Sequence, residues 1–449
     1  MKPRKSNIRI GSGAGFSGDL LEPAIELAEK GNLDYLVFEC LAERTIALAQ
    51  LQKLKHSNKG YDPFLEQRIK TFLPICLRKK IKIISNMGAA NPIAAADKII
   101  EIAKELGVKE LKVVAVSGDD VLESVQNKDY ILLESKTPFS KLLKKVVSAN
   151  AYLGINPIIK ALEQGADIII TGRVADPAIY MAPLFYEFDW NTEDPDILGK
   201  ATAMGHLLEC AAQVCGGYFY DANKKRIAET EQIGFPLADV SQDAEFKITK
   251  VQNSGGIITK ATCKEQLIYE IHDPKRYITP DVIADFSNIS FHEVSKDCIK
   301  INGATGIKKT GKLKVSIGYK DGFIGEGQIS YGGYQARERA ALALNVIKRK
   351  FIRLGYDEND TICELIGFNA LSKDHPIGKP EEVRLRVAVR TNTLDEAHRI
   401  GYQLEALYTN GPAGGGGAYK SVKEIIAVQS ILIDENMVNV HLTTKRLNS

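Results

Sequence analysis

The sequence lacks a long apolar run, a C-x-x-C pair and a large net charge. A membrane-spanning helix needs about 20 consecutive apolar residues, so we expect none here. The seven cysteines are odd in number and scattered, which predicts reduced thiols in a cytoplasmic protein and no zinc framework. The 59 basic and 56 acidic side chains leave a net charge of +3, which argues against a nucleic-acid or membrane-surface partner.

What is present is typical of a globular protein. The chain has 449 residues, of which 44% are hydrophobic and 26% charged. That length exceeds what one hydrophobic core usually supports, so two or three domains are expected. The basic N-terminus leads into a strand rather than an apolar segment, and therefore does not predict a secretory signal.

The most informative stretch is residues 166–177, in which an isoleucine run precedes a polar turn. Three consecutive β-branched residues are typical of a strand buried on both faces of a parallel sheet. Arg173 and Asp176 follow directly, at the strand end where open α/β sheets bind ligands. Asp176 before Pro177 is equally well explained as a helix cap, whereas the planar donors of Arg173 suit a carboxylate or phosphate.

Strand and helix patterns alternate through residue 180, which predicts a parallel α/β layer, either open or closed toward a barrel. Each predicted strand ends in polar side chains. One such end is common capping, but five ends together predict a site. The residues concerned are Ser12 and Asp19, Glu39 and Arg44, Asn86 and Asn91, Asp119 and Asp120, and Arg173 and Asp176.

The first strand leads into a glycine-rich segment in which Gly13, Gly15 and Gly18 match G-x-G-x-x-G. A dinucleotide fingerprint would open directly into a helix, but Pro23 marks a helix start beyond the last glycine. We therefore disfavour nicotinamide or flavin binding and expect Gly13, Gly15 and Asp19 to contact an anion through backbone N–H groups.

Two histidines are candidate proton shuttles. His206 and Glu209 share a face of a predicted helix at 201–216 and could form an acid–base pair, a metal site or a core histidine held by a carboxylate. No third ligand stands at helical spacing, which disfavours a divalent metal. His272, in a His-Asp-Pro turn, is the second candidate and has a helix stop as its alternative explanation.

The last third of the chain has the order βαββαβ, which predicts a ferredoxin-like α+β sandwich. A glycine run that includes Gly414, Gly415 and Gly416 precedes its last strand. Consecutive glycines predict either a flexible loop or close approach to a phosphate or carboxylate. We assign residues 1–315 to the α/β domain, with a strand-rich extension at 217–315, and residues 316–449 to the ferredoxin-like domain.

These motifs resemble the acyclic terpene utilisation family of AtuA-like proteins, once described as a domain of unknown function. The resemblance covers nearly the whole chain and is carried by residues 11–19, 34–45, 86–92, 171–177, 205–210 and 269–274 and by the C-terminal glycine run. It implies an AtuA domain followed by a ferredoxin-like domain. It also implies bacterial catabolism of citronellol- and geraniol-type terpenes, whose intermediates are branched acids carried as coenzyme A thioesters.

Two functions are consistent with these residues. The first is an enzyme that hydrates, dehydrates or cleaves a branched acyl-CoA or polycarboxylate, with His206 or His272 and Glu39 moving protons and Arg173 holding the anion. The second is a non-catalytic acyl-CoA- or carboxylate-binding subunit of a catabolic complex. The excess of carboxylates over cations at the strand ends favours catalysis. The sequence predicts a small-molecule partner, identifies no definite cofactor, and leaves open a coenzyme A thioester substrate, a disfavoured divalent metal and a homo-oligomer.

Overall fold

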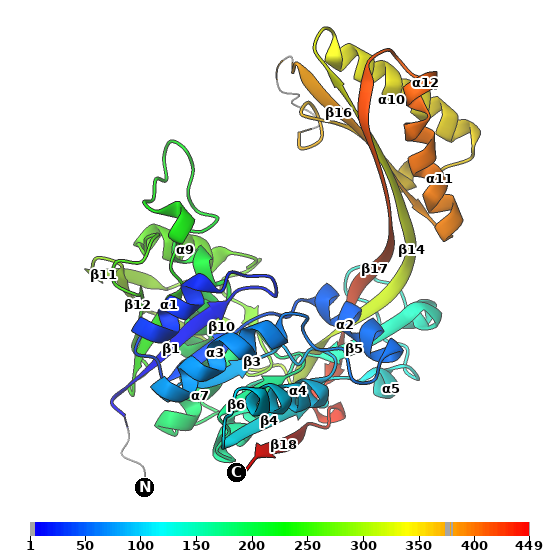
Figure 1. Cartoon of the computed structure of the whole chain (residues 1–449). Helices are drawn as coiled ribbons and strands as arrows, with labels where there is room; N and C mark the ends of the chain where they lie inside the picture. Colours follow the sequence, from blue (N-terminus) through cyan, green and yellow to red (C-terminus); the bar gives the residue numbers. More distant parts are fainter. Residues whose placement is uncertain (1–4, 373–377, 379, 449) are drawn as a thin grey trace. The chain divides into compact units, whose positions relative to one another are not determined.

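The computed structural model describes residues 5–372, 378 and 380–448. The chain forms two compact units, unit 1 from Met1–Gly318 and Val428–Ser449 and unit 2 from Tyr319–Ala427 (Figure 1). The sequence had placed all of 316–449 in the second domain. The last strand, β18 (His441–Leu447), instead pairs antiparallel with β4 (Leu111–Ser117), which places the C-terminal residues in unit 1.

Five strands of unit 1 run parallel, as the alternating pattern predicts. Their order across the sheet is β1-β2-β3-β6-β4, so a strand late in the chain lies between two earlier ones. The carboxyl ends of these strands therefore lie along one edge of the sheet. The bounds of the first four are Asn7–Ala14, Tyr35–Phe38, Lys82–Ser85 and Ile168–Thr171.

Antiparallel strands extend this sheet on both sides, so the sheet of unit 1 is mixed. Within the described residues it has ten strands in the linear order β11-β12-β8-β7-β1-β2-β3-β6-β4-β18, which is that of an open sheet. The strand-rich segment after residue 217 supplies most of the additions, namely β7 (Pro236–Ser241), β8 (Phe246–Lys250), β11 (Ser290–Ser295) and β12 (Cys298–Asn302). The short strands β9 (Tyr277–Ile278), β10 (Val282–Asp285) and β13 (Thr305–Lys308) form a separate sheet.

Helices cover both faces of the parallel strands, because alternate strand residues are apolar on both sides. Ile83, Ile168 and Ile170 pack against one helix group, and Ile84 and Ile169 pack against the other. The first group, with α3 and α4 in contact, is α1 (Glu22–Lys30), α3 (Leu65–Lys79) and α4 (Pro92–Glu105). The second group is α6 (Asn156–Glu163), α7 (Ala178–Phe188) and α8 (Pro195–Glu209). None of the described helices is long and apolar enough to cross a membrane.

A smaller core in unit 1 surrounds β5 (Val146–Ala151), a strand that sequence reasoning missed. β5 pairs with β14 (Lys312–Gly332), whose first residues belong to unit 1. The end of β17 (Gly415–Asp434) contributes to the same core through Ile431 and Ile433. The core also includes residues near the short helix α5 (Leu122–Val125), while α2 (Glu43–Lys55) and α9 (Lys260–Ile268) complete the helices of unit 1.

Unit 2 has the element order that the sequence predicts. β14, α10 (Ala336–Arg353), β15 (Thr361–Ile366), β16 (Glu382–Thr391), α11 (Leu394–Glu405), the short α12 (Leu407–Asn410) and β17 follow one another. The sheet order is β15-β16-β14-β17. Both long helices contribute to one core with the strands, and Figure 1 shows them on the same side of the sheet.

Candidate functional site

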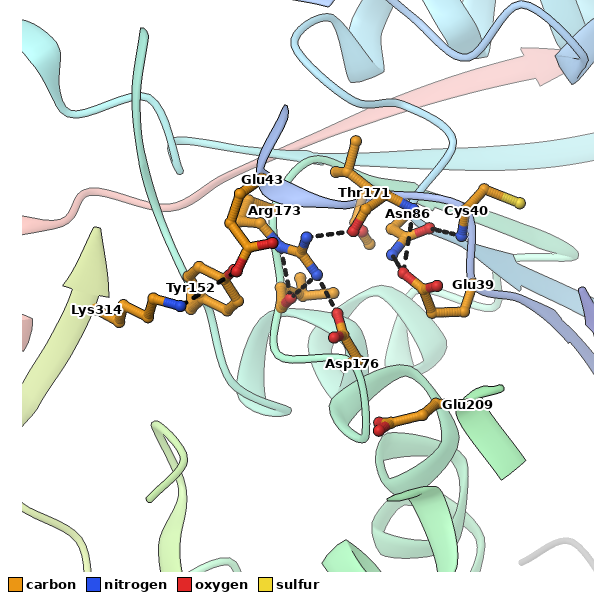
Figure 2. Close-up of polar contacts among 12 residues, drawn as sticks. Glu39, Cys40, Glu43, Asn86, Tyr152, Thr171, Arg173, Asp176, Glu209 and Lys314 are labelled. Carbon is orange, nitrogen blue, oxygen red and sulfur yellow. Dashed lines mark hydrogen bonds and ion pairs between the residues drawn. The ribbon is translucent and has the colours of Figure 1, made fainter. Parts of the chain in front are cut away.

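Polar side chains meet at the carboxyl ends of β2, β3 and β6. Asn86 is fully buried, donates from Nδ2 to Glu39 Oε1 (2.8 Å) and accepts from the Cys40 N–H through Oδ1 (2.8 Å). The Leu41 N–H donates to the same oxygen of Glu39 (3.1 Å). These three bonds fix the Glu39 carboxyl against the strand ends, as Figure 2 shows.

The surroundings of Glu39 favour its protonated form. Its side chain is buried, and burial raises the pKa of the carboxyl well above its usual range; the nearby Asp176 charge acts in the same direction. Arg173 and the hydrogen bond from Asn86 oppose the shift without cancelling it. This raised pKa makes Glu39 a better candidate for a proton donor than an ordinary glutamate.

Arg173 is buried and lies among the polar side chains at these strand ends. Its Nε and one Nη donate to the Val174 carbonyl (2.9 and 2.8 Å), and its Nη groups also donate to the Leu41 carbonyl and to Asp176. Four of the five N–H donors of the guanidinium are thus used by the protein. The guanidinium also lies 4.5 Å from the ring centroid of Tyr152. This geometry suits a residue that positions Asp176 and the strand ends.

Asp176, one turn after Arg173, keeps 39% of its side chain exposed. Arg173 donates to one carboxylate oxygen of Asp176. The other oxygen has no partner among the described hydrogen bonds, so it is available to a substrate. The surrounding protein and the Glu209 charge raise its pKa, and Arg173 opposes them. Figure 2 shows Asp176 turned toward Arg173 and Glu39 turned toward Asn86, with Glu209 on the far side of Asp176 from Arg173. The Asp176 charge acts on the pKa of Glu39, and the Glu209 charge acts on that of Asp176. These three carboxyl groups form the carboxylate cluster.

A second, ionised carboxylate lies on the other side of Arg173. Tyr152 donates from its hydroxyl to Glu43 Oε1 (2.6 Å), and Lys314 Nζ donates to the same oxygen (3.1 Å). Burial alone would raise the pKa of Glu43, but the Tyr152 hydrogen bond and the Lys314 charge outweigh it and lower the pKa to about 2. The pKa values of Glu39 and Glu43 are therefore shifted in opposite directions, which is a common feature of carboxyl groups in active sites.

Asp119 supports the turn that carries Arg173. Its Oδ2 accepts from the Arg173 backbone N–H and from Asn150 Nδ2, both at 2.9 Å. Burial raises the pKa of Asp119 to about 6, although these bonds lower it. The carboxylate also lies where a Cβ on Gly172 would stand, so only glycine fits there. Asp119 thus acts on the site through Arg173.

His206 is buried in α8 with both ring nitrogens engaged. Nδ1 lies 2.6 Å from Glu209 Oε1, and Nε2 lies 3.1 Å from the Leu267 carbonyl. A carbonyl only accepts, so Nε2 carries a proton. Burial acts to lower the pKa of His206, but Glu209 and the carbonyl bond raise it on balance. The second oxygen of Glu209 is buried without a hydrogen-bond partner among the described residues. Glu209, rather than the imidazole, is therefore the member of this pair that can meet a ligand.

The other residues predicted from the sequence have different surroundings. Gly13 lies inside β1 against the Phe38 ring, and Asp19 caps its own loop by accepting from the N–H groups of Gly15 and Leu20 (2.9 and 2.8 Å). Asn91 caps α4 and donates to the carbonyls of Ser57 and Lys59.

Three further candidates are outside the cluster described above. Arg44 is exposed on α2, and His272 is exposed after α9. Gly414, Gly415 and Gly416 lie in unit 2, where Arg339 donates to the Ala413 carbonyl (2.8 Å) beside them. Their predicted contact with an anion stays a prediction.

Sequence reasoning missed Asn150, Tyr152 and Lys314. Asn150 lies in β5, Tyr152 directly after it, and Lys314 in β14. Tyr152 and Lys314, which bind Glu43, are each more than 100 residues from it in the sequence. No local motif marks them. The one available signal was the unassigned aromatic and polar content of residues 146–152.

The chain matches the model of the acyclic terpene utilisation family, AtuA, over residues 8–444. It therefore belongs to this family, as its motifs indicated, and the family implies involvement in acyclic terpene utilisation. No curated protein and no solved structure matches the chain.

Proposed function

We propose that this protein is a catabolic enzyme that hydrates or dehydrates a branched acyl-CoA or carboxylate, with C–C cleavage as the related lyase reaction. The observation that carries the proposal is the protonation pattern around Arg173. Glu39 is a buried carboxylic acid, Glu43 is ionised, and Asp176 is partly exposed beside them. Acid–base catalysis at neutral pH needs this kind of division between groups.

In the dehydration direction, Asp176 removes a proton from the carbon next to the acyl carbonyl. Glu39 donates its proton to the β-hydroxyl group, the C–O bond breaks, and water leaves as the C=C bond forms. Asp176 then loses its proton to solvent, and Glu39 regains one. Hydration follows the same steps in reverse. Arg173 positions Asp176, and Asn86 orients the Glu39 carboxyl.

The substrate handle is the group that holds the carboxylate or thioester of the substrate. The sequence suggested Arg173 and the glycine-rich segments as anion contacts, with coenzyme A as carrier. Because four Arg173 donors bind the protein, we assign the handle to backbone N–H groups of the glycine-rich segment at residues 11–19 of unit 1 instead. A resident cofactor or metal has no role in the proposed steps, and we propose a cytoplasmic location.

Unit 2 is proposed to be a ferredoxin-like domain. Its βαββαβ element order, its sheet order and the packing of both long helices into one core support this assignment.

The test is a panel of branched 3-hydroxyacyl-CoA and enoyl-CoA thioesters incubated with wild type and with Glu39→Gln. Glutamine keeps the hydrogen bond from Asn86 but has no proton to donate, so we expect kcat to fall about 100-fold or more. Glu101→Gln, at an exposed glutamate of α4, is the matched control and should keep wild-type turnover. Equal turnover in Glu39→Gln would remove Glu39 from the chemistry.

A non-catalytic acyl-binding subunit is the second candidate. It is favoured by the engagement of Arg173 donors and of both His206 nitrogens within the protein, as expected of a structural network. Tight binding of a thioester from the panel, with no product detected by mass spectrometry, would support this function over the first.

A further inference from the structure

A cavity of about 800 Å³ lies at the amino ends of β1 and β2, whereas the carboxylate cluster lies at the carboxyl ends of the parallel strands. Arg9 near the start of β1 and Asn32 just before β2 line it, whereas Glu39 follows the end of β2. Four strand residues span about 13 Å, so the cavity is separate from the carboxylate cluster. Its volume is within the range of small-molecule sites.

Cations that the protein leaves largely unengaged line this cavity. The Arg9 guanidinium has a single long ion pair, 3.8 Å to Asp239, and its Nε has no hydrogen-bond partner among the described residues. Lys296 is exposed and has no described ion pair within the part of the chain that the structure covers. Lys30 pairs only with Glu26 on the helix surface, a contact that contributes little. This contrasts with Arg173, whose donors are mostly used.

The acidic residues of the cavity are partly compensated. Asp297 accepts from the Ile258 N–H (2.9 Å) and lies 3.5 Å from the Nζ of Lys250, whose side chain is 2% exposed. Lys250 also donates to the Ser254 carbonyl (2.5 Å). Glu229 is then the one lining carboxylate, among the described residues, without such a compensating pair, whereas three cations, Arg9, Lys30 and Lys296, line the same cavity. The cavity therefore favours an anion.

The lining also includes neutral hydrogen-bonding side chains, namely Asn32, Gln252, Asn253 and Ser295, beside apolar residues and glycines. We propose that the cavity binds a phosphate ester of a polar small molecule, such as a nucleoside diphosphate. Arg9 and Lys296 contact the phosphates, and the amide and hydroxyl groups contact the rest of the ligand. This site does not depend on the chemistry proposed for Glu39.

The experiment is calorimetric titration of the full chain with ADP, with coenzyme A and with inorganic phosphate. We expect ADP or coenzyme A to bind, and the double variant Arg9→Gln/Lys296→Gln to weaken Kd at least 10-fold. The control is Lys112→Gln/Lys445→Gln, which removes the same charge from β4 and from the edge strand β18. It should change Kd less than 2-fold. Glu39→Gln should bind ADP as wild type does, so a failure of the proposed enzyme function would not affect this result.

Three results would overturn the proposal. The first is no binding of either ester at millimolar concentration, and the second is binding of inorganic phosphate alone. The third is equal loss of affinity in both double variants, which would indicate a general charge effect. If Arg9→Gln/Lys296→Gln unfolds, Lys296→Gln alone decides, because its side chain is exposed; an unchanged Kd in that variant would count against the site.

Discussion

Replacing Arg173 with lysine tests what the buried guanidinium does. Lysine keeps the charge but has one nitrogen, so it cannot reach the carbonyls of Leu41 and Val174 and the Asp176 carboxylate together. Each buried acceptor left without a donor costs about 1–3 kcal/mol. Asp176 is 39% exposed and water can replace its lost bond, so we expect a total loss of about 3 kcal/mol from the carbonyls.

The single tryptophan of the sequence, Trp190, lies in unit 1 and donates to the Gln242 carbonyl (2.9 Å). Its fluorescence in urea therefore follows the unfolding of the unit that contains Arg173. Arg78→Lys, at a guanidinium 58% exposed, is the control and should change the free energy of unfolding by less than about 0.5 kcal/mol. If Arg173→Lys unfolds as wild type does but loses thioester binding, Arg173 contacts the substrate, as the sequence suggested, and our interpretation is refuted.

Three further predictions concern the surroundings of Arg173. Asp119 has a folded pKa of about 6, above its unfolded value of about 4, so its ionisation lowers stability as pH rises between those values. Asp119→Asn should therefore gain stability relative to wild type, by up to about 3 kcal/mol from pH 4 to pH 7 in urea titrations, and a constant difference would contradict the shift. Gly172→Ala would place a methyl group against the Asp119 carboxylate, and we expect a lower melting temperature, whereas an unchanged one would show that the turn can move. His206→Asn should lower the melting temperature while turnover per folded molecule stays near normal, because both ring nitrogens bind the protein; a 100-fold fall in turnover would restore His206 as the proton shuttle.

The parallel strands of unit 1 could be predicted because each contains closely spaced apolar residues that are followed by polar ones. The same logic predicted that Glu39, Asn86, Asp119 and Arg173 lie near one another, since parallel strands end at one edge. In the structure Asn86 donates to Glu39, and the Arg173 N–H donates to Asp119. The order βαββαβ in unit 2 was readable from helix and strand periods of ordinary length. Local patterns therefore sufficed wherever the chain alternates regularly.

The pairing of distant strands could not be predicted in this way. β18 resembles any short terminal strand, and only its ladder with β4 shows that it belongs to unit 1. The Glu43–Tyr152–Lys314 contacts depend on β5 meeting β14, a pairing with no local sequence signal. The sequence also marked Arg173 as a ligand contact because its residue type suits anions, whereas its donors are used by nearby carbonyls.

The most direct test of the central claim is the protonation state of Glu39 itself. Infrared difference spectroscopy of wild type against Glu39→Gln, titrated across pH, isolates the carboxyl band of this one side chain. Because burial and the Asp176 charge raise its pKa, we predict a carboxylic acid band at pH 5 that persists well above the pH at which an ordinary glutamate ionises. A carboxylate band at pH 7 that persists down to about pH 5 would contradict the assignment of Glu39 as the proton donor.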